Sequence, residues 1–252
     1  MSNSPLVSYT KISPNKTSPR KHKIDTITIH CVVGQCSVER LGTIFTPTSK
    51  KASCNYGIGS DGRVGMYVEE KDRSWCSSNA ANDNRAITIE CASDTTHPYA
   101  INDKVYATLI ELCADICKRN GIKELKWKGD KTLIGQVDKQ NMTVHRWFAN
   151  KACPGDYIYE RLGTIASEVN KRLGVKTSDT STTPTNKVSY RVKVEISNLR
   201  IRSAPTTISE SKGFIKPGVY TIVSEAEGRG ATKWGKLKSG AGWISLDYCT
   251  KV

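Results

Sequence analysis

The stretch VHRWFANKACPGDY, Val144 to Tyr157, brings a His, a Lys, a Cys and a Pro-Gly turn close together in the chain. Cys153 follows His145 by eight positions, and a loop of that length can fold the thiol back towards the imidazole. These residue types are compatible with a metal site, with a Cys/His nucleophile site, or with an ordinary helix end. The segments on either side of the stretch decide among the three.

Patterns typical of strands and helices interleave around this stretch. Asp25–Val33 and Ala86–Ala92 have the short apolar runs of buried strands, and the turn SDGR lies between two short apolar runs, which predicts a hairpin over Cys54–Glu70. Apolar residues recur at helical spacing over Asn102–Gly121 and Asp156–Gly174. The order of these elements predicts an α/β domain with a central mixed β-sheet flanked by helices.

The composition changes after this domain. Val175–Lys187, VKTSDTSTTPTNK, is rich in Ser and Thr and has no large apolar residue after its first position, which is typical of a linker. The remaining chain consists of short β-like segments separated by Gly or Pro turns, and this pattern predicts a small all-β barrel. We therefore expect a first domain over residues 1–174, a linker over 175–187 and a second domain over 188–252.

The net charge indicates an anionic partner. The 38 Lys and Arg residues exceed the 24 Asp and Glu residues and give a formal charge of +14. From Lys187 to Val252 there are 12 basic and 5 acidic residues, so this quarter of the chain carries half of the excess. Such a charge suits nucleic acid, an anionic membrane or an anionic cell-wall polymer. No run of five basic residues and no recognised nucleic-acid-binding motif occurs, so we do not expect nucleic acid as the partner.

Cysteine usage and the N-terminal sequence predict synthesis in the cytoplasm. The nine cysteines are odd in number and scattered, unlike a disulfide framework. The first twenty residues contain no apolar segment of the kind found in signal peptides, and no apolar run approaches the roughly 18–20 residues that a membrane-spanning helix needs. We expect neither a signal peptide nor a membrane segment.

Three residues have the chemistry of a zinc site. His30 ends the expected strand TITIH, where its side chain can enter a cleft at the edge of the sheet, and His145 and Cys153 lie in the opening stretch. Zinc binds imidazole and thiolate in tetrahedral geometry, and catalytic sites keep three protein ligands and one open position. The alternative is that the three are unrelated: a packed histidine in the sheet, a second histidine, and a buried thiol at a turn.

Four motifs, in order, carry a family resemblance: ITIHC (27–31), CNYGIGSDGRV (54–64), NRAITIE (84–90) and TVHRWFANKACPGDYIYERL (143–162). Together they resemble the type-2 family of zinc-dependent N-acetylmuramoyl-L-alanine amidases, over roughly Ser8 to Gly174. The resemblance implies a peptidoglycan hydrolase that cleaves the amide between N-acetylmuramic acid and L-alanine, with an amidase or peptidoglycan-recognition-protein fold.

The resemblance also implies roles for individual residues. Zn2+ would be held by His30, His145 and Cys153. Glu90 would move the proton between water and the leaving amine, and Tyr56 and Lys151 would donate to the developing oxyanion. The neighbour of the family's active-site tyrosine is often His, whereas this chain has Asn55 there.

The tail has a resemblance of its own. NLRIRSAPT, GVYTIV and KWGKLKSGAGWISLDYC resemble the bacterial Src-homology-3-type domain, which often follows lytic enzymes and binds cell walls. Its basic charge predicts attraction to anionic wall polymers, and Trp234, Trp243 and Tyr248 suggest an aromatic binding groove. The combination resembles a phage endolysin, which stays in the cytoplasm until a holin releases it to the wall.

Two other functions remain open on the sequence. The first is a peptidoglycan-recognition module without catalysis, which would lack the third metal ligand, whereas Cys153 is present here. The second is a Cys/His wall peptidase in which Cys31 or Cys54 is the nucleophile, although neither cysteine begins a helix within a peptidase motif.

Overall fold

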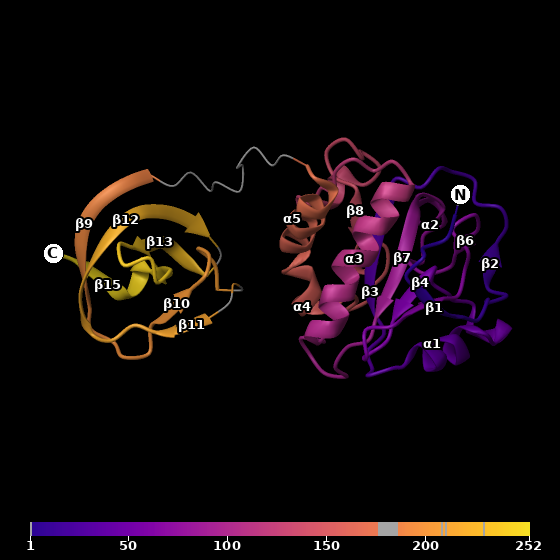
Figure 1. Ribbon diagram of the computed structural model, residues 1–252, viewed down its shortest axis with the longest axis horizontal. Coiled ribbons are helices and arrows are strands. Elements are labelled where there is room, and N and C mark those ends of the chain that lie inside the picture. Colours follow the sequence, from indigo (N-terminus) through magenta and orange to yellow (C-terminus); the bar gives the residue numbers. More distant parts are fainter. Residues whose placement is uncertain (1, 176–185, 208, 210, 229) are drawn as a thin grey trace. The chain divides into compact units, whose positions relative to one another are not determined.

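The computed structural model describes residues 2–175, 186–207, 209, 211–228 and 230–252. The chain forms two compact units, Met1–Lys176 and Thr177–Val252 (Figure 1). The linker predicted over Val175–Lys187 falls mainly on residues 176–185, which lie outside the described residues. No helix in the described ranges is both long enough and apolar enough to cross a membrane.

The first unit is built on a six-stranded mixed sheet with the order β1-β5-β4-β7-β3-β8. Strands β4, β7, β3 and β8 run parallel to one another, whereas β5 is antiparallel to β4 and parallel to β1. The predicted fold class, an α/β domain with a central mixed sheet plus an all-β domain, is confirmed. The strands are β1 Val7–Thr10, β3 Thr26–Cys31, β4 Tyr56–Ile58, β5 Val64–Met66, β7 Ala86–Cys91 and β8 Met142–Val144, and β2 Lys16–Thr17 pairs separately with β6 Arg73–Ser74.

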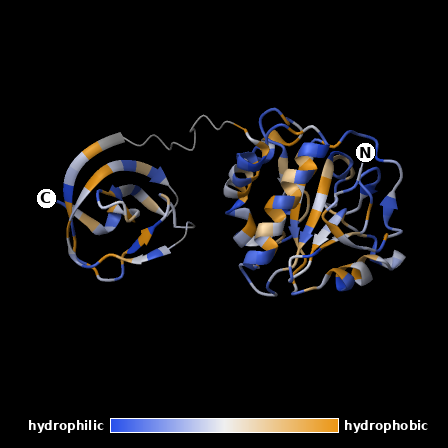
Figure 2. Ribbon diagram, in the orientation of Figure 1, coloured by the Kyte–Doolittle hydropathy of each residue, from blue (hydrophilic) through white to orange (hydrophobic). Residues whose placement is uncertain are grey.

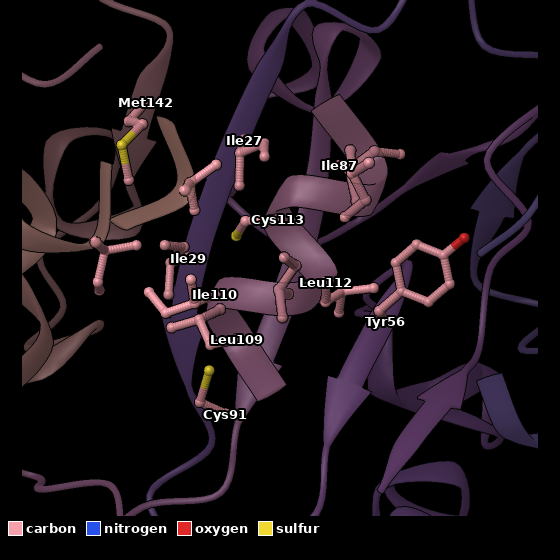
Figure 3. Close-up of a cluster of buried hydrophobic side chains, with 14 of the residues drawn as sticks. Ile27, Ile29, Tyr56, Ile87, Cys91, Leu109, Ile110, Leu112, Cys113 and Met142 are labelled. Atoms are coloured by element: carbon pink, nitrogen blue, oxygen red, sulfur yellow. The ribbon is translucent and has the colours of Figure 1, made fainter. Parts of the chain in front are cut away.

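Alternation along the central strands gives the sheet two chemically different faces. In β3 and β7 the isoleucines point to one face, where they pack against helix α3, Asp103–Arg119 (Figure 3). The residues between them, Thr28 and His30 in β3 and Thr88 and Glu90 in β7, point to the other face. Thr28 there shares a hydrogen bond of 2.7 Å with Thr143 of β8. One face of the sheet therefore packs in the apolar core. The other face carries the polar side chains, among them His30 and Glu90 at the ends of β3 and β7.

Helix α3 covers the apolar face because its sequence is amphipathic. Asn102 caps its N-terminus by accepting from the Val105 N–H, and Gly121, with φ of 70°, follows its end. Its buried positions recur every three or four residues, and hydrophobic and hydrophilic colours alternate along it in Figure 2. Helix α5, Leu162–Leu173, packs beside it.

The single helix predicted over Asp156–Gly174 is in fact two, α4 Gly155–Tyr159 and α5. The amide of Arg161 donates to Ile158 O at 2.9 Å, an i→i−3 bond that tightens the turn and interrupts the regular helix. Two further helices, α1 Val38–Phe45 and α2 Ala80–Arg85, are capped by Ser37 and Asn79. Asn82 of α2 bonds Thr28 and Thr143, which ties α2 to the polar face of the sheet.

The second unit is a seven-stranded antiparallel sheet with the order β11-β10-β14-β13-β12-β9-β15. Its main core is aliphatic and includes Val192, Ile222 and Ile244. The predicted all-β domain is thus confirmed. The strands are β9 Asn186–Val194, β10 Arg200–Arg202, β11 Ser211–Phe214, β12 Gly218–Gly228, β13 Ala231–Leu237, β14 Trp243–Ser245 and β15 Cys249–Lys251.

The aromatic groove expected on this unit is wrong in its composition. Trp234 and Trp243 are only 2% and 8% exposed and pack with Ala226 in a second small core. Tyr248 is exposed, as is Phe214 of β11. The register of β13 against β14 places Trp234 opposite Ser245 and Lys236 opposite Trp243, so both tryptophans lie on one face of the sheet, where they pack with Ala226.

Candidate metal centre and active-site cleft

Three adjacent parallel strands bring the candidate site residues to one edge of the sheet. His30 of β3 lies directly beside Glu90 of β7 in the register, and β8, on the other side of β3, ends at Val144 just before His145. In sheets with parallel strands the carboxyl ends are where ligands generally bind. The fold therefore collects side chains that are far apart in the sequence.

The opening stretch folds as a loop that returns its thiol to this edge. After the 3₁₀ turn His145–Trp147, the amide of Arg146 donates to Cys153 O at 3.1 Å. The Arg146 guanidinium also bonds Asp156 Oδ1 at 2.9 Å, which holds the two ends of the loop together. This closure places Cys153 next to His30 at the edge of the sheet.

His30, His145 and Cys153 form a compact donor set. Cys153 Sγ lies 3.3 Å from His30 Nδ1, and the two imidazole ring centroids are 5.2 Å apart. One donor atom from each of the three residues lies within 4.8 Å of the others. The structure thus brings together the three residues predicted as metal ligands.

Burial prepares the two imidazoles for metal binding. Desolvation and, to a smaller extent, the charge of His145 together lower the pKa of the fully buried His30 to about 3. Desolvation followed by the Lys151 charge also lowers the pKa of His145. Both rings are therefore neutral at pH 7, which is the form that coordinates a metal.

The donor chemistry of the set fits zinc. Two neutral imidazoles and one thiol are ligands that zinc prefers, with one position left for a substrate. The Cys153 thiol has a raised pKa because it bonds the Cys31 thiol and is buried. A bound cation would lower the pKa of the Cys153 thiol, because a metal binds the thiolate form and so displaces the thiol proton.

Glu90 lies at the floor of the same site. Burial raises its pKa to about 7, opposed by a hydrogen bond from Cys76 and by the Lys50 charge. Cys76 Sγ is 3.8 Å from Glu90 Oε1, and Glu90 Oε2 is buried without a hydrogen-bond partner among the described residues. A carboxyl group with a pKa near neutrality can both take up and release a proton.

Tyr56 lies on the opposite face of the sheet from the metal donors. In the register Tyr56 pairs with Ile89, whereas Gly57 pairs with Glu90, so the Tyr56 ring joins the apolar core (Figure 3). Its hydroxyl donates to Glu70 Oε1 at 2.8 Å and accepts from the Ser4 amide at 2.9 Å. The predicted role of Tyr56 as an oxyanion donor does not agree with this placement, and we assign it a structural role.

A cleft of about 800 Å³ opens over the donor set. Lys151 is exposed and lines this cleft together with His145 and Cys153, so the structure brings Lys151 to the site. Glu90 lines the cleft as well. Ser78, at its rim, lies 3.0 Å from His145 Nε2 through its hydroxyl.

The comparison with known families agrees with this geometry. Residues 20–156, more than half of the chain, match the family described as N-acetylmuramoyl-L-alanine amidase. The chain belongs to that family. The predicted enzyme class is thereby confirmed: the protein is an N-acetylmuramoyl-L-alanine amidase, a hydrolase of peptidoglycan.

Solved structures resemble the amidase over about two thirds of its length. They include a mutant endolysin from Bacillus subtilis, with 14% identity, TM-score 0.47 and coverage of 64% of this chain and 97% of the other. An AmpD derivative has 18% identity, TM-score 0.46 and coverage of 63% and 93%. N-acetylmuramoyl-L-alanine amidase LysC from Clostridium intestinale URNW has 16% identity, TM-score 0.41 and coverage of 68% and 96%. No curated protein matches the chain.

Several residues of the amidase's cleft have no signature in the sequence. Cys76, Lys50, Arg73 and Asp83 all line it, yet they lie in loops and short elements without a motif of their own. Asp83 shapes the wall, because its carboxylate accepts from the amides of Cys76 and Ser77 at 3.0 and 3.2 Å. The only sequence signal for this segment was its place between the hairpin and β7.

Proposed function

We propose that this amidase is an endolysin-type, zinc-dependent enzyme in which His30, His145 and Cys153 hold the metal. The observation that carries the proposal is that His145, Cys153 and Glu90 line one cleft and that buried His30 lies within 4.8 Å of ligand atoms from each of them. The two neutral imidazoles and the thiol match a catalytic zinc site with an open position. When bound, zinc supplies Lewis-acid chemistry: it polarises a carbonyl oxygen and makes water a stronger acid.

Glu90 is the proposed proton carrier. Its carboxylate takes a proton from the attacking water and delivers it to the amine of L-alanine as the amide carbon–nitrogen bond breaks. A pKa near 7 suits both steps, because the group is neither a very weak base nor a very weak acid at neutral pH. Its position beside His30 places it next to the metal donors.

Lys151 is the proposed oxyanion donor. Its side chain is exposed at the cleft beside His145, and its charge lowers the pKa of that imidazole, as expected for a nearby cation. An ammonium group at this place stabilises the negative charge that develops on the carbonyl oxygen. Lys50 and Arg73 add positive charge to the cleft, which suits a peptide that carries carboxylates.

The second unit is the proposed wall-binding domain, of the Src-homology-3 type. The excess of seven positive charges over Lys187–Val252 attracts anionic wall polymers by a salt-sensitive force. With the tryptophans buried, its exposed aromatic groups are Phe214, over which the Arg200 guanidinium stacks at 4.8 Å, and Tyr248. A cation–aromatic pair of this kind offers both charge and a flat apolar surface.

The two alternative functions are less well supported by the site. A recognition module without catalysis has no use for a complete donor set next to a carboxyl group with a pKa of about 7. A peptidase nucleophile must be accessible as thiolate. Cys54 is fully buried and its pKa is raised well above the ordinary value, and Cys31 has the Cys153 thiol rather than an imidazole as its hydrogen-bond partner.

Mass spectrometry of digested cell walls tests the proposed reaction. The wild-type enzyme should release stem peptides with free L-alanine amino termini, and a Glu90→Gln variant should release almost none. New reducing sugar ends, or new amino termini inside the stem peptide without free L-alanine, would contradict the proposal. Dialysis against a zinc chelator, followed by zinc addition, should abolish and restore the same products.

A further inference from the structure

A second donor set shares His30 with the first. His30, Cys76 and Glu90 each offer one ligand atom, and these atoms all lie within 4.8 Å of one another. Cys76 and Glu90 are already in contact, with 3.8 Å between Sγ and Oε1. Imidazole, thiolate and carboxylate are all zinc ligands, so the chemistry of this set suits a soft divalent cation.

The protein fixes Cys76 in this position. The residue follows β6, and its amide donates to Asp83 Oδ2 at 3.0 Å. Asp83 belongs to helix α2, which Asn82 anchors to Thr28 of the sheet at 3.0 Å. The thiol is therefore held at the cleft by two elements rather than by a free loop.

Two polar atoms of His30 and Glu90 are buried and have no hydrogen-bond partner among the described residues. They are His30 Nε2, on a side chain with 0% exposure, and Glu90 Oε2. Buried polar groups are nearly always paired, because an unpaired group loses the hydrogen bonds that it makes to water in the unfolded chain. The Nδ1 atom of the same ring lies 3.3 Å from Cys153 Sγ, which leaves Nε2 as the nitrogen available to a second ligand.

We propose that His30, Cys76 and Glu90 form a second binding position for zinc, separate from the His30, His145 and Cys153 position, and that filling it inhibits the enzyme. The inhibition rests on the proposed function, since Glu90 is there the proton carrier. Coordination of its carboxylate to a cation lowers the basicity of that carboxylate, so it no longer takes the proton from water. Binding releases the Cys76 thiol proton and the remaining imidazole proton to solvent, which leaves the ring as an imidazolate between two ions.

The second position is the weaker of the two. A first ion at the shared imidazole repels a second one, and the Cys76 thiol must lose its proton inside a buried site. The enzyme should therefore be active with one zinc per chain and inhibited only when zinc is in excess. Such a response would limit the activity in a zinc-rich medium.

Titration of the full-length enzyme with zinc tests this inference. Zinc is added from zero to a large excess, the bound metal is measured by equilibrium dialysis, and the release of wall peptides is measured at each point. Activity should rise with the first equivalent and then fall on the order of 10²-fold as a second equivalent binds, because the contribution of the general base is lost. Cys76→Ser and Cys76→Ala should bind one zinc and keep their own activity in excess zinc. Cys36→Ser, a variant of a half-buried cysteine outside the cleft lining, should behave as wild type.

The outcomes separate this inference from the proposed function. If the wild-type chain binds only one zinc, or if the Cys76 variants are inhibited at the same zinc concentration as wild type, the second position is wrong. If activity is independent of the first equivalent, the proposed zinc dependence fails instead. The wild-type stoichiometry decides the case even where a Cys76 variant does not fold, which circular dichroism would show.

Discussion

The metal-free Glu90→Gln variant should gain stability relative to the wild-type protein as the pH rises. The same replacement should remove the activity of the zinc-loaded enzyme. Burial raises the pKa of Glu90 from an ordinary value of 4.5 to about 7. Between these two values the folded state keeps a proton that the unfolded state has released. The stability of the wild-type protein therefore falls as pH rises through this window, at about 1.4 kcal/mol per pH unit. Over the window the loss contributed by Glu90 amounts to about 3 kcal/mol, and Gln, which does not titrate, avoids it.

Urea unfolding of the full-length chain, with metal removed by chelation, measures the effect. The free energy of unfolding of Glu90→Gln minus that of wild type should be about 3 kcal/mol more positive at pH 8 than at pH 4. Glu111→Gln, on the exposed side of α3, is the matched control and should show no such change. With zinc restored, Glu90→Gln should retain the metal but lose on the order of 10²–10⁴-fold in turnover. A stability difference that is the same at both pH values, or a variant with near-normal turnover, would refute the reasoning.

Three further predictions concern other parts of the molecule. Tyr56→Phe should lower the free energy of unfolding by about 0.5–1.5 kcal/mol, because the bond to Glu70 is lost, and should leave kcat/KM unchanged in a muropeptide assay. Lys151→Ala should lower kcat on the order of 10²–10³-fold, while Lys171→Ala, on exposed α5, should not; equal rates for the two would exclude an oxyanion role. A chain ending at Val175 should cleave soluble muropeptides normally but lyse cells more slowly, and unchanged lysis would show that the second unit does not target the enzyme.

Local patterns were sufficient to predict most of the fold. The isoleucine runs of β3 and β7 and the helical spacing of Asn102–Gly121 depend only on neighbours in the chain, and the structure has these elements within a few residues of their predicted bounds. The grouping of His30, His145 and Cys153 was also predicted. His30 ends an expected strand, and Cys153 lies on the loop that follows His145.

The predictions that were wrong or missing concern side chains whose position depends on contacts between segments that are distant in the sequence. The face on which Tyr56 lies depends on the register of β4 against β7, and a shift of one residue would have exchanged Tyr56 with Gly57. The burial of Trp234 likewise depends on pairing between strands. Cys76 reaches Glu90 through the β6–α2 connection, which has no periodic pattern. Sequence periodicity carries no information on these contacts.

The zinc content of the purified protein tests the central claim most directly. Wild-type enzyme, dialysed against metal-free buffer, should retain one zinc per chain by elemental analysis, and Cys153→Ala should retain almost none while its circular dichroism spectrum stays that of a folded protein. Full zinc content in Cys153→Ala, or an active wild-type enzyme without zinc, would contradict the assignment of His30, His145 and Cys153 as the metal centre.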